Sequence, residues 1–295
     1  MVRYVTAGVD ESDESLAAAH WAAREALRRG GVLRLVHAWT PRLGPVPSVR
    51  ELAEQTLQRA VRSVRVARPG LPMEELMPAD SALAALLEAA EDSEILALGS
   101  RGLAPIAGFV VGSVSQRVVA RSPRPVVLVR AGETAADEHL PALNGVSPDE
   151  IPETPYRDVV LGLDTRHPTD EPIEFAFDSA RRRGTGLHVI HAFSPRPGHA
   201  VAGRSGPEPE PGPLAAQEHL VALLRPWREK FPAVPVSEAV AEGRAAQELV
   251  RASARASLVV VGRRTREARL GTHIGSVAHA VLHHARCPVV VVPHA

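Results

Sequence analysis

The sequence predicts an α/β protein made of two tandem domains, each a parallel sheet with helices on both faces. Short apolar runs alternate with longer amphipathic stretches that have the period of a helix. The alternation fades once, near the middle of the 295 residues, and then begins again. Segments of the second half also repeat segments of the first at a nearly constant spacing. One doubly wound unit is therefore expected twice.

The first half contains the pattern of one complete domain. Strands are expected at residues 4–9, 33–39, 73–77, 95–98 and 125–129, with helices at 13–29, 49–68, 81–90 and 112–122. Ser12 is suited to cap the first helix because its side chain can accept a backbone N–H, and Gly30 is suited to end it. This order predicts a flavodoxin-like (Rossmann-like) five-stranded sheet with strand order 3-2-1-4-5.

A linker separates the two halves. Residues 132–155 are rich in Gly, Pro, Asp and Glu, a composition typical of linkers. The predicted domains are therefore 1–131 and 156–295. Because an unpaired edge strand exposes backbone polar groups, the fifth strands, 126–129 and 289–292, are expected to cover one another's edges. The chain would then form an intramolecular pseudo-dimer, and further association into a homodimer is left open.

The repeat also locates an insertion. Val159 corresponds to Val5 at a spacing of 154 residues, whereas Gly275 corresponds to Gly112 at a spacing of 163. The extra residues are expected at 195–213, a segment rich in Pro, Gly and Glu that is too poor in apolar residues to pack. This segment is predicted to be a mobile surface loop.

Composition narrows the function classes. Lys and Arg together number 34, and so do Asp and Glu, which argues against a chain-wide footprint for nucleic acid or a membrane surface. No apolar run approaches the roughly 18 to 20 residues of a membrane helix, and the N-terminus lacks the features of a signal peptide. The only cysteine, Cys287, cannot form an internal disulfide and lacks an evident activating base. A cytoplasmic protein is expected.

A glycine-rich segment follows the fourth strand. Gly99 and Gly102 allow the backbone to approach a ligand, and Gly112 with Ser113 opens the next helix, whose free N–H groups favour an anion. Asp10 ends the first strand. With strand order 3-2-1-4-5, the first and fourth strands are neighbours at the point where ligands bind in doubly wound sheets. These residues therefore predict a nucleotide-like ligand, with a carboxylate for the nucleoside and amides for the phosphates.

The spacing Gly99-x-x-Gly102, nine residues, then Gly112-Ser113, together with Gly8-Val9-Asp10, resembles the ATP-binding branch of the universal stress protein family. The second copy makes the chain similar to a tandem member. The resemblance implies an ATP-binding regulatory protein of stress or dormancy, with accompanying Mg²⁺ left open and a regulatory protein partner conceivable. No contact with nucleic acid or membrane is implied.

The resemblance assigns roles residue by residue. Asp10 would contact the adenosine end, the Val36 backbone would lie beside the adenine, and Arg101 would add charge. The residues implied to bind nucleotide in the first domain are Gly8, Val9, Asp10, Val36, Gly99, Ser100, Arg101, Gly102, Gly112, Ser113, Val114 and Ser115. Glu11 stands where the family commonly has Gly or Pro, which would place a like charge near phosphate if its side chain pointed inward.

The second copy of the motif is degenerate. Thr265 stands where Gly102 would be, and Ala278 replaces Ser115. If the backbone at Thr265 required a positive φ, a β-branched residue there would be strained by about 1 kcal/mol or more. The counterparts implied to bind nucleotide are Gly162, Asp164, Ile190, Gly262, Arg263, Gly275, Ser276 and Val277. Retention and loss of nucleotide in this half are both left open.

Other clusters favour structural interpretations. His279 and His283 are four residues apart, but no second ligand pair is evident, so surface histidines are expected instead of a metal site. His37 and His191 are predicted to be packed, hydrogen-bonded residues. Arginines at the ends of two helices are expected on solvated faces, where the helix dipole favours them. These arginines are Arg24, Arg28, Arg29, Arg181, Arg182 and Arg183.

Three functional hypotheses follow. The leading one is a nucleotide-binding regulatory module that uses the first domain. The second is a slow ATPase or phosphotransferase using the same cleft, although the sequence lacks a Gly-Lys-Ser/Thr phosphate loop and a recognisable nucleophile set. The third is a partner-binding protein that holds no nucleotide.

Overall fold

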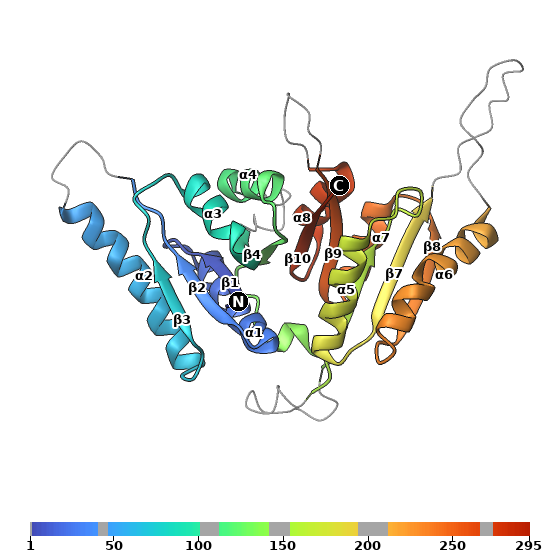
Figure 1. The fold of residues 1–295 in the computed structure, drawn as a ribbon, viewed down its shortest axis with the longest axis horizontal. Helices are drawn as coiled ribbons and strands as arrows, with labels where there is room; N and C mark the ends of the chain where they lie inside the picture. Colours follow the sequence, from blue (N-terminus) through green and yellow to red (C-terminus); the bar gives the residue numbers. More distant parts are fainter. Residues whose placement is uncertain (1, 41–46, 101–111, 142–153, 194–211, 266–273) are drawn as a thin grey trace, which may run out of the picture.

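The computed structural model describes residues 2–40, 47–100, 112–141, 154–193, 212–265 and 274–295. The first half forms the expected parallel sheet, with its strands in the order β3-β2-β1-β4-β5 (Figure 1). The strands are β1 (Tyr4–Gly8), β2 (Val32–Val36), β3 (Met73–Leu76), β4 (Ser93–Ser100) and β5 (Val126–Arg130). The helices are α1 (Asp13–Arg29), α2 (Pro47–Ala67), α3 (Ala82–Glu91) and α4 (Ser113–Arg121).

The second half repeats this topology. Its strands are β6 (Asp158–Gly162), β7 (Leu187–Phe193), β8 (Val236–Glu242), β9 (Ala256–Arg264) and β10 (Val289–His294). Its helices are α5 (Asp170–Arg183), α6 (Pro213–Lys230), α7 (Ala245–Ser253) and α8 (Ser276–His284), and a short 3-10 helix, η1 (Ala136–Glu138), precedes it. The predicted loop at 195–213 lies outside the described residues except for its last two, at the start of α6.

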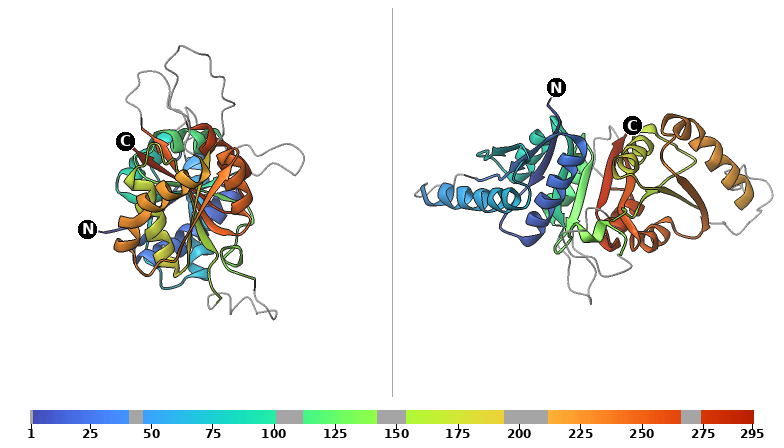
Figure 2. Two further views of the ribbon diagram at one scale, coloured as in Figure 1. Left: turned by 90° about the vertical axis from the view of Figure 1, so that its right-hand side faces the viewer. Right: turned by 90° about the horizontal axis from the view of Figure 1, so that it is seen from below.

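The two halves join through their fifth strands. β5 and β10 pair antiparallel, with Val127 opposite Val290, so ten strands form one continuous sheet (Figure 2). This confirms the predicted mutual covering of the two edges. One apolar layer, beneath α1, α2, α5 and α6, covers one face of the sheet, and a second layer, beneath α3, α4, α7 and α8, covers the other. Both layers contain residues from both halves, so the domains share a core.

Local signals set the helix boundaries. Ser12 caps α1, because its side chain accepts the N–H of Ser15 at 3.2 Å. Gly30 and Gly184 end α1 and α5 with φ of 60° and 62°, a left-handed conformation that favours glycine. The two helices end at corresponding repeat positions, yet α5 begins at Asp170, three residues later in the repeat than α1. The second domain therefore shapes the loop after its first strand differently.

A buried ion cluster joins the halves, which corrects the expectation of solvated arginines. Glu25 pairs with Arg29 of its own helix at 2.7 Å and with Arg183 of α5 at 3.0 Å. Arg29 and Arg183 occupy the same position in the repeat, whereas Ser179 stands at the counterpart of Glu25. One carboxylate therefore serves the equivalent arginines of both domains. Of the arginines named above, Arg181 keeps an exposed side chain.

The predicted linker contributes to the same interface. The carboxylate of Glu138 in η1 is fully buried and pairs with Arg24 at 2.7 Å and Arg28 at 2.9 Å. The composition of this segment did not indicate the buried position of Glu138, because an acidic residue in a polar segment is ordinarily exposed to solvent. Residues 136–138 are therefore anchored to α1.

In the described part of the chain, no helix has both the length and the apolar character that a membrane-spanning helix needs.

Candidate functional site

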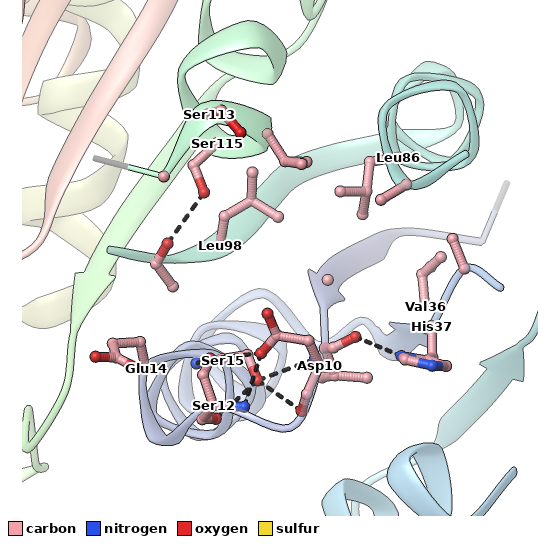
Figure 3. Close-up of a pocket in the computed structure, with 17 residues that line it drawn as sticks. Asp10, Ser12, Glu14, Ser15, Val36, His37, Leu86, Leu98, Ser113 and Ser115 are labelled. Carbon is pink, nitrogen blue, oxygen red and sulfur yellow. Dashed lines mark hydrogen bonds between the residues drawn. The ribbon is translucent and has the colours of Figure 1, made fainter. Parts of the chain in front are cut away.

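A cavity of about 260 Å³ opens at the carboxyl ends of β1 and β4, between the start of α1 and the start of α4 (Figure 3). It lies where the strand order reverses, because β2 and β4 flank β1 on opposite sides. Its lining contains most of the predicted first-domain residues. They are Gly8, Val9, Asp10, Val36, Gly99, Gly112, Ser113, Val114 and Ser115.

Asp10 lies on the α1 side of the cavity, opposite Ser113 and Ser115 (Figure 3). Its Oδ1 accepts hydrogen bonds from both the N–H, at 2.9 Å, and the hydroxyl of Ser12. Its own N–H donates to the hydroxyl of Ser15 at 3.0 Å. These bonds hold the carboxylate in place before any ligand arrives, which is the preorganisation that a binding site requires.

Gly99 is needed for packing as well as for the cavity. A Cβ at this position would lie 2.7 Å from Glu14 C and Ser15 N, because β4 runs close beneath the start of α1. The carbonyl of Gly99 also accepts a hydrogen bond from the hydroxyl of Ser115 at 3.1 Å, linking β4 to α4. The glycine therefore brings both helix starts to the same strand end.

One end of the cavity has an apolar lining and a polar backbone edge. Val36, Leu86 and Leu98 provide apolar walls. The carbonyl of Val36 accepts the N–H of Val9 at 2.9 Å, so this part of the predicted Val36 backbone is already used by the sheet. Within the described residues, the N–H and C=O of Ala38 have no hydrogen-bond partner, and Ala38 also lines the cavity. Ala38, which the sequence interpretation missed, is the better candidate for reading a base edge.

The other end of the cavity is the start of α4. Gly112 caps this helix without a side-chain hydrogen bond, and Ser113, Val114 and Ser115 form its first turn. The N–H groups of a first helical turn lack intrahelical acceptors and sit at the positive end of the helix dipole. Among the described residues, a Cβ on Gly112 would meet only Ser115 Oγ, at 4.0 Å. Space beside these donors suits an anionic group.

One first-domain prediction, Ser100, is described and does not line the cavity, and two others fall outside the described residues. Ser100 is buried, with 3% of its surface exposed, and does not line the cavity. A side chain alternates between the faces of a strand, so Ser100 and Gly99 necessarily point apart. Arg101 and Gly102 lie outside the described residues, and their assigned roles remain predictions.

The second domain places its counterpart aspartate in a different setting. Oδ1 of Asp164 accepts the N–H of Arg166 at 3.1 Å, and His167 Nδ1 lies 3.3 Å from Oδ2. Arg166 stands at the repeat position of Ser12 and Thr169 at that of Ser15. The N–H of Arg166 therefore repeats the bond from the Ser12 N–H to Asp10. The helix starts later, so within the described residues the hydroxyl bonds of Ser12 and Ser15 at Asp10 have no equivalent, and the carboxylate of Asp164 lies beside two basic side chains.

Other counterparts are also used for packing. A Cβ on Gly162 would lie 2.6 Å from the Leu249 side chain, and one on Gly262 would lie 2.9 Å from the His294 ring. Thr265 donates from both its N–H and its hydroxyl to His294 O, each at 2.7 Å. Among the described residues only glycines have a positive φ, so the strain considered for Thr265 is absent. The hydroxyl instead secures the end of β10.

The helix start of the second domain keeps the geometry of the first. Gly275 has φ −55° and ψ 151°, close to the −56° and 147° of Gly112, and Ser276 and Val277 open α8 as expected. Ala278 is buried and offers no hydroxyl where Ser115 bonds Gly99. Ile190 is buried, and its carbonyl accepts the N–H of Leu163 at 3.0 Å, as Val36 does for Val9.

Arg263 does not lie as a phosphate ligand would. Its guanidinium is buried, with 6% of the residue exposed, and Nη2 donates to Ser122 O at 2.6 Å. Ser122 follows α4, so the side chain reaches into the first domain. The structure thus gives Arg263 an interface contact in place of the predicted nucleotide contact.

The structure bears out the structural interpretation of His37 and His191. His37 Nδ1 donates to Val9 O at 2.8 Å, and His191 Nδ1 donates to Leu163 O at 3.1 Å, so both are hydrogen-bonded structural residues. The described part of the chain contains no group of three or more metal-ligating side chains, and His279 is exposed. Cys287 is buried, and burial raises the pKa of its thiol.

Several cavity residues could not be recognised from the sequence, because only their place in the fold brings them to the cavity. In the sequence, Ser12 and Ser15 resemble helix-capping residues, and Ala38 and Leu86 resemble core residues. The lining residues that the sequence did not assign to the site are Ser12, Glu14, Ser15, His37, Ala38, Ala82, Leu86 and Leu98.

Fold and site together define a fused pair of flavodoxin-like α/β domains, the first of which has an open cleft at its strand ends. A model of the universal stress protein family matches residues 1–130 and 155–293, once in each half. The chain therefore belongs to the universal stress protein family.

Relatives of the same length support this membership. The chain is 32% identical to universal stress protein Rv2005c of Mycobacterium tuberculosis, over 97% of this chain and 96% of that protein. It is 29% identical to universal stress protein Rv2623 of the same organism, over 97% of this chain and 95% of that protein. A crystal structure of a universal stress protein from Archaeoglobus fulgidus covers 99% of this chain and 98% of its own, with a TM-score of 0.71 and 17% identity. That structure shares the tandem fold.

Proposed function

We propose that the chain is a regulatory stress-response protein that binds an adenine nucleotide, specifically ATP, in the cleft of its first domain. One observation carries this proposal. A single cavity joins the unpartnered N–H and C=O of Ala38, within the described residues, to the open first turn of α4, with Asp10 on the wall facing that turn. These groups match the base, the phosphates and the ribose of a nucleotide, in that order.

The base end supplies both shape and hydrogen bonds. Val36, Leu86 and Leu98 line it, and burial of a flat base against apolar groups is favourable. An adenine presents an acceptor nitrogen beside an amino donor, and the N–H and C=O of Ala38 complement this pair. The pattern at Ala38 supports a base at this end, and the family resemblance supports adenine as that base.

The ribose and phosphates follow from the remaining groups. A carboxylate held by Ser12, such as that of Asp10, accepts hydrogen bonds from ribose hydroxyls. The phosphates would then lie against Gly112, Ser113 and Ser115, where the helix supplies donors and positive potential. The sequence lacks a Gly-Lys-Ser/Thr phosphate loop, and the described lining of the cleft contains no lysine or arginine. We therefore propose nucleotide binding as the activity and the cytoplasm as the location.

The second domain is proposed to hold no nucleotide. Asp164 lies beside Arg166 and His167, Arg263 reaches the neighbouring domain, and Ala278 lacks the hydroxyl of Ser115. Its helix start alone does not provide a nucleoside site. The two domains are therefore unequal, with one serving the ligand and the other the fold.

Isothermal titration with ATP tests this function. Asp10→Ala should weaken affinity about 10-fold to 100-fold, because it removes hydrogen bonds to a charged group. Gly112→Ala should weaken ATP affinity about 10-fold or more, because its Cβ meets no close neighbour among the described residues but occupies the space beside the helix donors. Asp164→Ala is the matched control and should bind like the wild type.

The outcomes separate the hypotheses. Unchanged affinity in Asp10→Ala and Gly112→Ala, or no binding by the wild type, would overturn the assignment. Nucleotide recovered intact after long incubation supports a binding module, whereas product that scales with protein and vanishes in Asp10→Ala supports the slow ATPase instead.

A further inference from the structure

Arg263 has a setting that stability alone does not explain. It is 6% exposed, its Nε has no hydrogen-bond partner within the described residues, and no carboxylate there pairs with it. Burial lowers the pKa of its guanidinium, which shows that desolvation of this charge is not repaid by an acidic neighbour. Its one hydrogen bond is the 2.6 Å contact with Ser122 O.

That contact falls on the helix whose other end lines the cleft. Ser122 terminates α4, and its carbonyl belongs to the negative end of the helix dipole, where a cation is favoured. The turn is rigid, because Ser122 N–H donates to Val118 O at 2.8 Å and Ser122 Oγ donates to Arg124 O at 2.8 Å. Arg263 therefore grips a well-fixed point of α4.

The amino end of α4 is joined to β4 by one side chain of its first turn within the described residues. Gly112 provides no side-chain cap, and the hydroxyl of Ser115 donates to Gly99 O. A nine-residue helix moves nearly as a rigid rod, so a shift at Ser122 also moves Ser113 and Ser115. The position of the cleft donors thus depends on the second domain.

The repeat does not reproduce this contact at the corresponding positions. Ser100 is the counterpart of Arg263, and Ala285 is the counterpart of Ser122. A serine side chain is too short to reproduce the reach of an arginine, and within the described residues the Ser100 side chain makes no hydrogen bond to Ala285. The contact between Arg263 and Ser122 is therefore particular to the second domain's strand β9.

We propose that Arg263 is a positioning residue for the nucleotide site: the second domain uses it to hold α4 so that its first turn can receive the phosphates. The inference rests on the proposed function of the first domain. Arg263 belongs to the degenerate motif of the second domain, but in this proposal it acts on the first domain by fixing the position of α4. The groups proposed to bind the base and the ribose, Ala38 and Asp10, follow β2 and β1, so a shift of α4 should not move them.

The test compares ATP with adenosine, because only ATP uses the start of α4. Arg263→Met should weaken ATP about threefold to tenfold, which corresponds to one lost hydrogen bond, and change adenosine affinity less than about twofold. Arg263→Lys keeps the charge but loses the planar fork, so it should show a smaller loss with the same selectivity for ATP. Arg264→Met, at the exposed neighbouring position, is the control and should match the wild type.

Each outcome decides the proposal. Equal losses for ATP and adenosine would indicate a general structural role and overturn it, as would unchanged ATP affinity in Arg263→Met. If Arg263→Met does not fold, as judged by thermal unfolding, Arg263→Lys decides by the same ratio. A wild type that binds no ATP overturns the proposed function and this inference together, whereas ATP binding without selective loss overturns this inference alone.

Discussion

Glu25→Gln should lower the free energy of unfolding by about 3–5 kcal/mol, the cost of leaving buried charges without their partner. Glu25 faces Arg28 at 3.0 Å, Arg29 at 2.7 Å and Arg183 at 3.0 Å. Glutamine keeps the shape but removes the negative charge that these arginines share. Urea unfolding measures the change, with Glu94→Gln as the control.

Glu94 offers a matched comparison because it also pairs with Arg29, at 3.2 Å, but is 32% exposed. Solvent screens this pair, so its loss should cost less than about 1 kcal/mol. A loss for Glu25→Gln no larger than that for Glu94→Gln would contradict the role of the cluster in joining the domains.

The same cluster gives a pH dependence. Burial opposes ionisation of Glu25, but the charges of Arg183, Arg28 and Arg29 outweigh it and hold its pKa well below the usual range. A carboxyl with a depressed pKa stabilises the fold fully above its unfolded pKa of about 4.3, and this contribution is lost as pH falls toward the folded pKa. Wild-type stability should therefore fall below about pH 4 more steeply than that of Glu25→Gln.

Gly99→Ala should lower the free energy of unfolding by about 1–3 kcal/mol and weaken ATP binding with it. The added Cβ would lie 2.7 Å from two backbone atoms of α1, Glu14 C and Ser15 N, which cannot turn aside as a side chain can. Moving α1 away from β4 would disturb the turn that fixes Asp10. Urea unfolding and ATP titration measure the two effects.

Gly70→Ala is the control for this substitution. No atom of the described residues lies within 4 Å of a Cβ at Gly70, and its φ is not in the left-handed region. Its stability should be unchanged or slightly higher, because alanine reduces the entropy of the unfolded chain. Equal stability of Gly99→Ala and Gly70→Ala would show that the contact between β4 and α1 can relax without cost.

Much of the fold could be predicted because its signals are local. The first strand and helix follow from an apolar run, from Ser12 as the N-cap of the helix and from Gly30 at its C-terminal end. The internal repeat then predicts the same pattern for the second half. The pairing of β5 with β10 followed from the need to cover two unpaired strand edges. These features depend on short stretches of sequence and on general rules of sheet architecture.

The errors concern residues whose partners are distant in sequence. Glu25 and Arg183 are 158 residues apart, so no local pattern announces their pairing, and helix-end arginines looked solvated. Arg263 looked like a ligand because of its place in the glycine motif, yet its partner is 141 residues away. Long-range contacts of this kind become visible only once the two sheets are joined.

The site was predicted in part for the same reason. Asp10, Gly112 and Ser113 follow from strand ends and a helix start, and all three line the cavity. Ala38 was missed because the choice between Val36 and Ala38 depends on which backbone groups the sheet already uses. The carbonyl of Val36 is already hydrogen-bonded to the N–H of Val9, whereas Ala38 lies beyond the end of β2.

The number of nucleotides bound per chain tests the central claim most directly, because the chain contains two copies of the fold and we propose a single nucleotide site. Native mass spectrometry at an ATP concentration just sufficient to saturate the wild type should show one nucleotide per chain, with occupancy strongly reduced in Asp10→Ala and retained in Asp164→Ala. Two nucleotides per chain, or a single one that is lost in Asp164→Ala and kept in Asp10→Ala, would contradict the account.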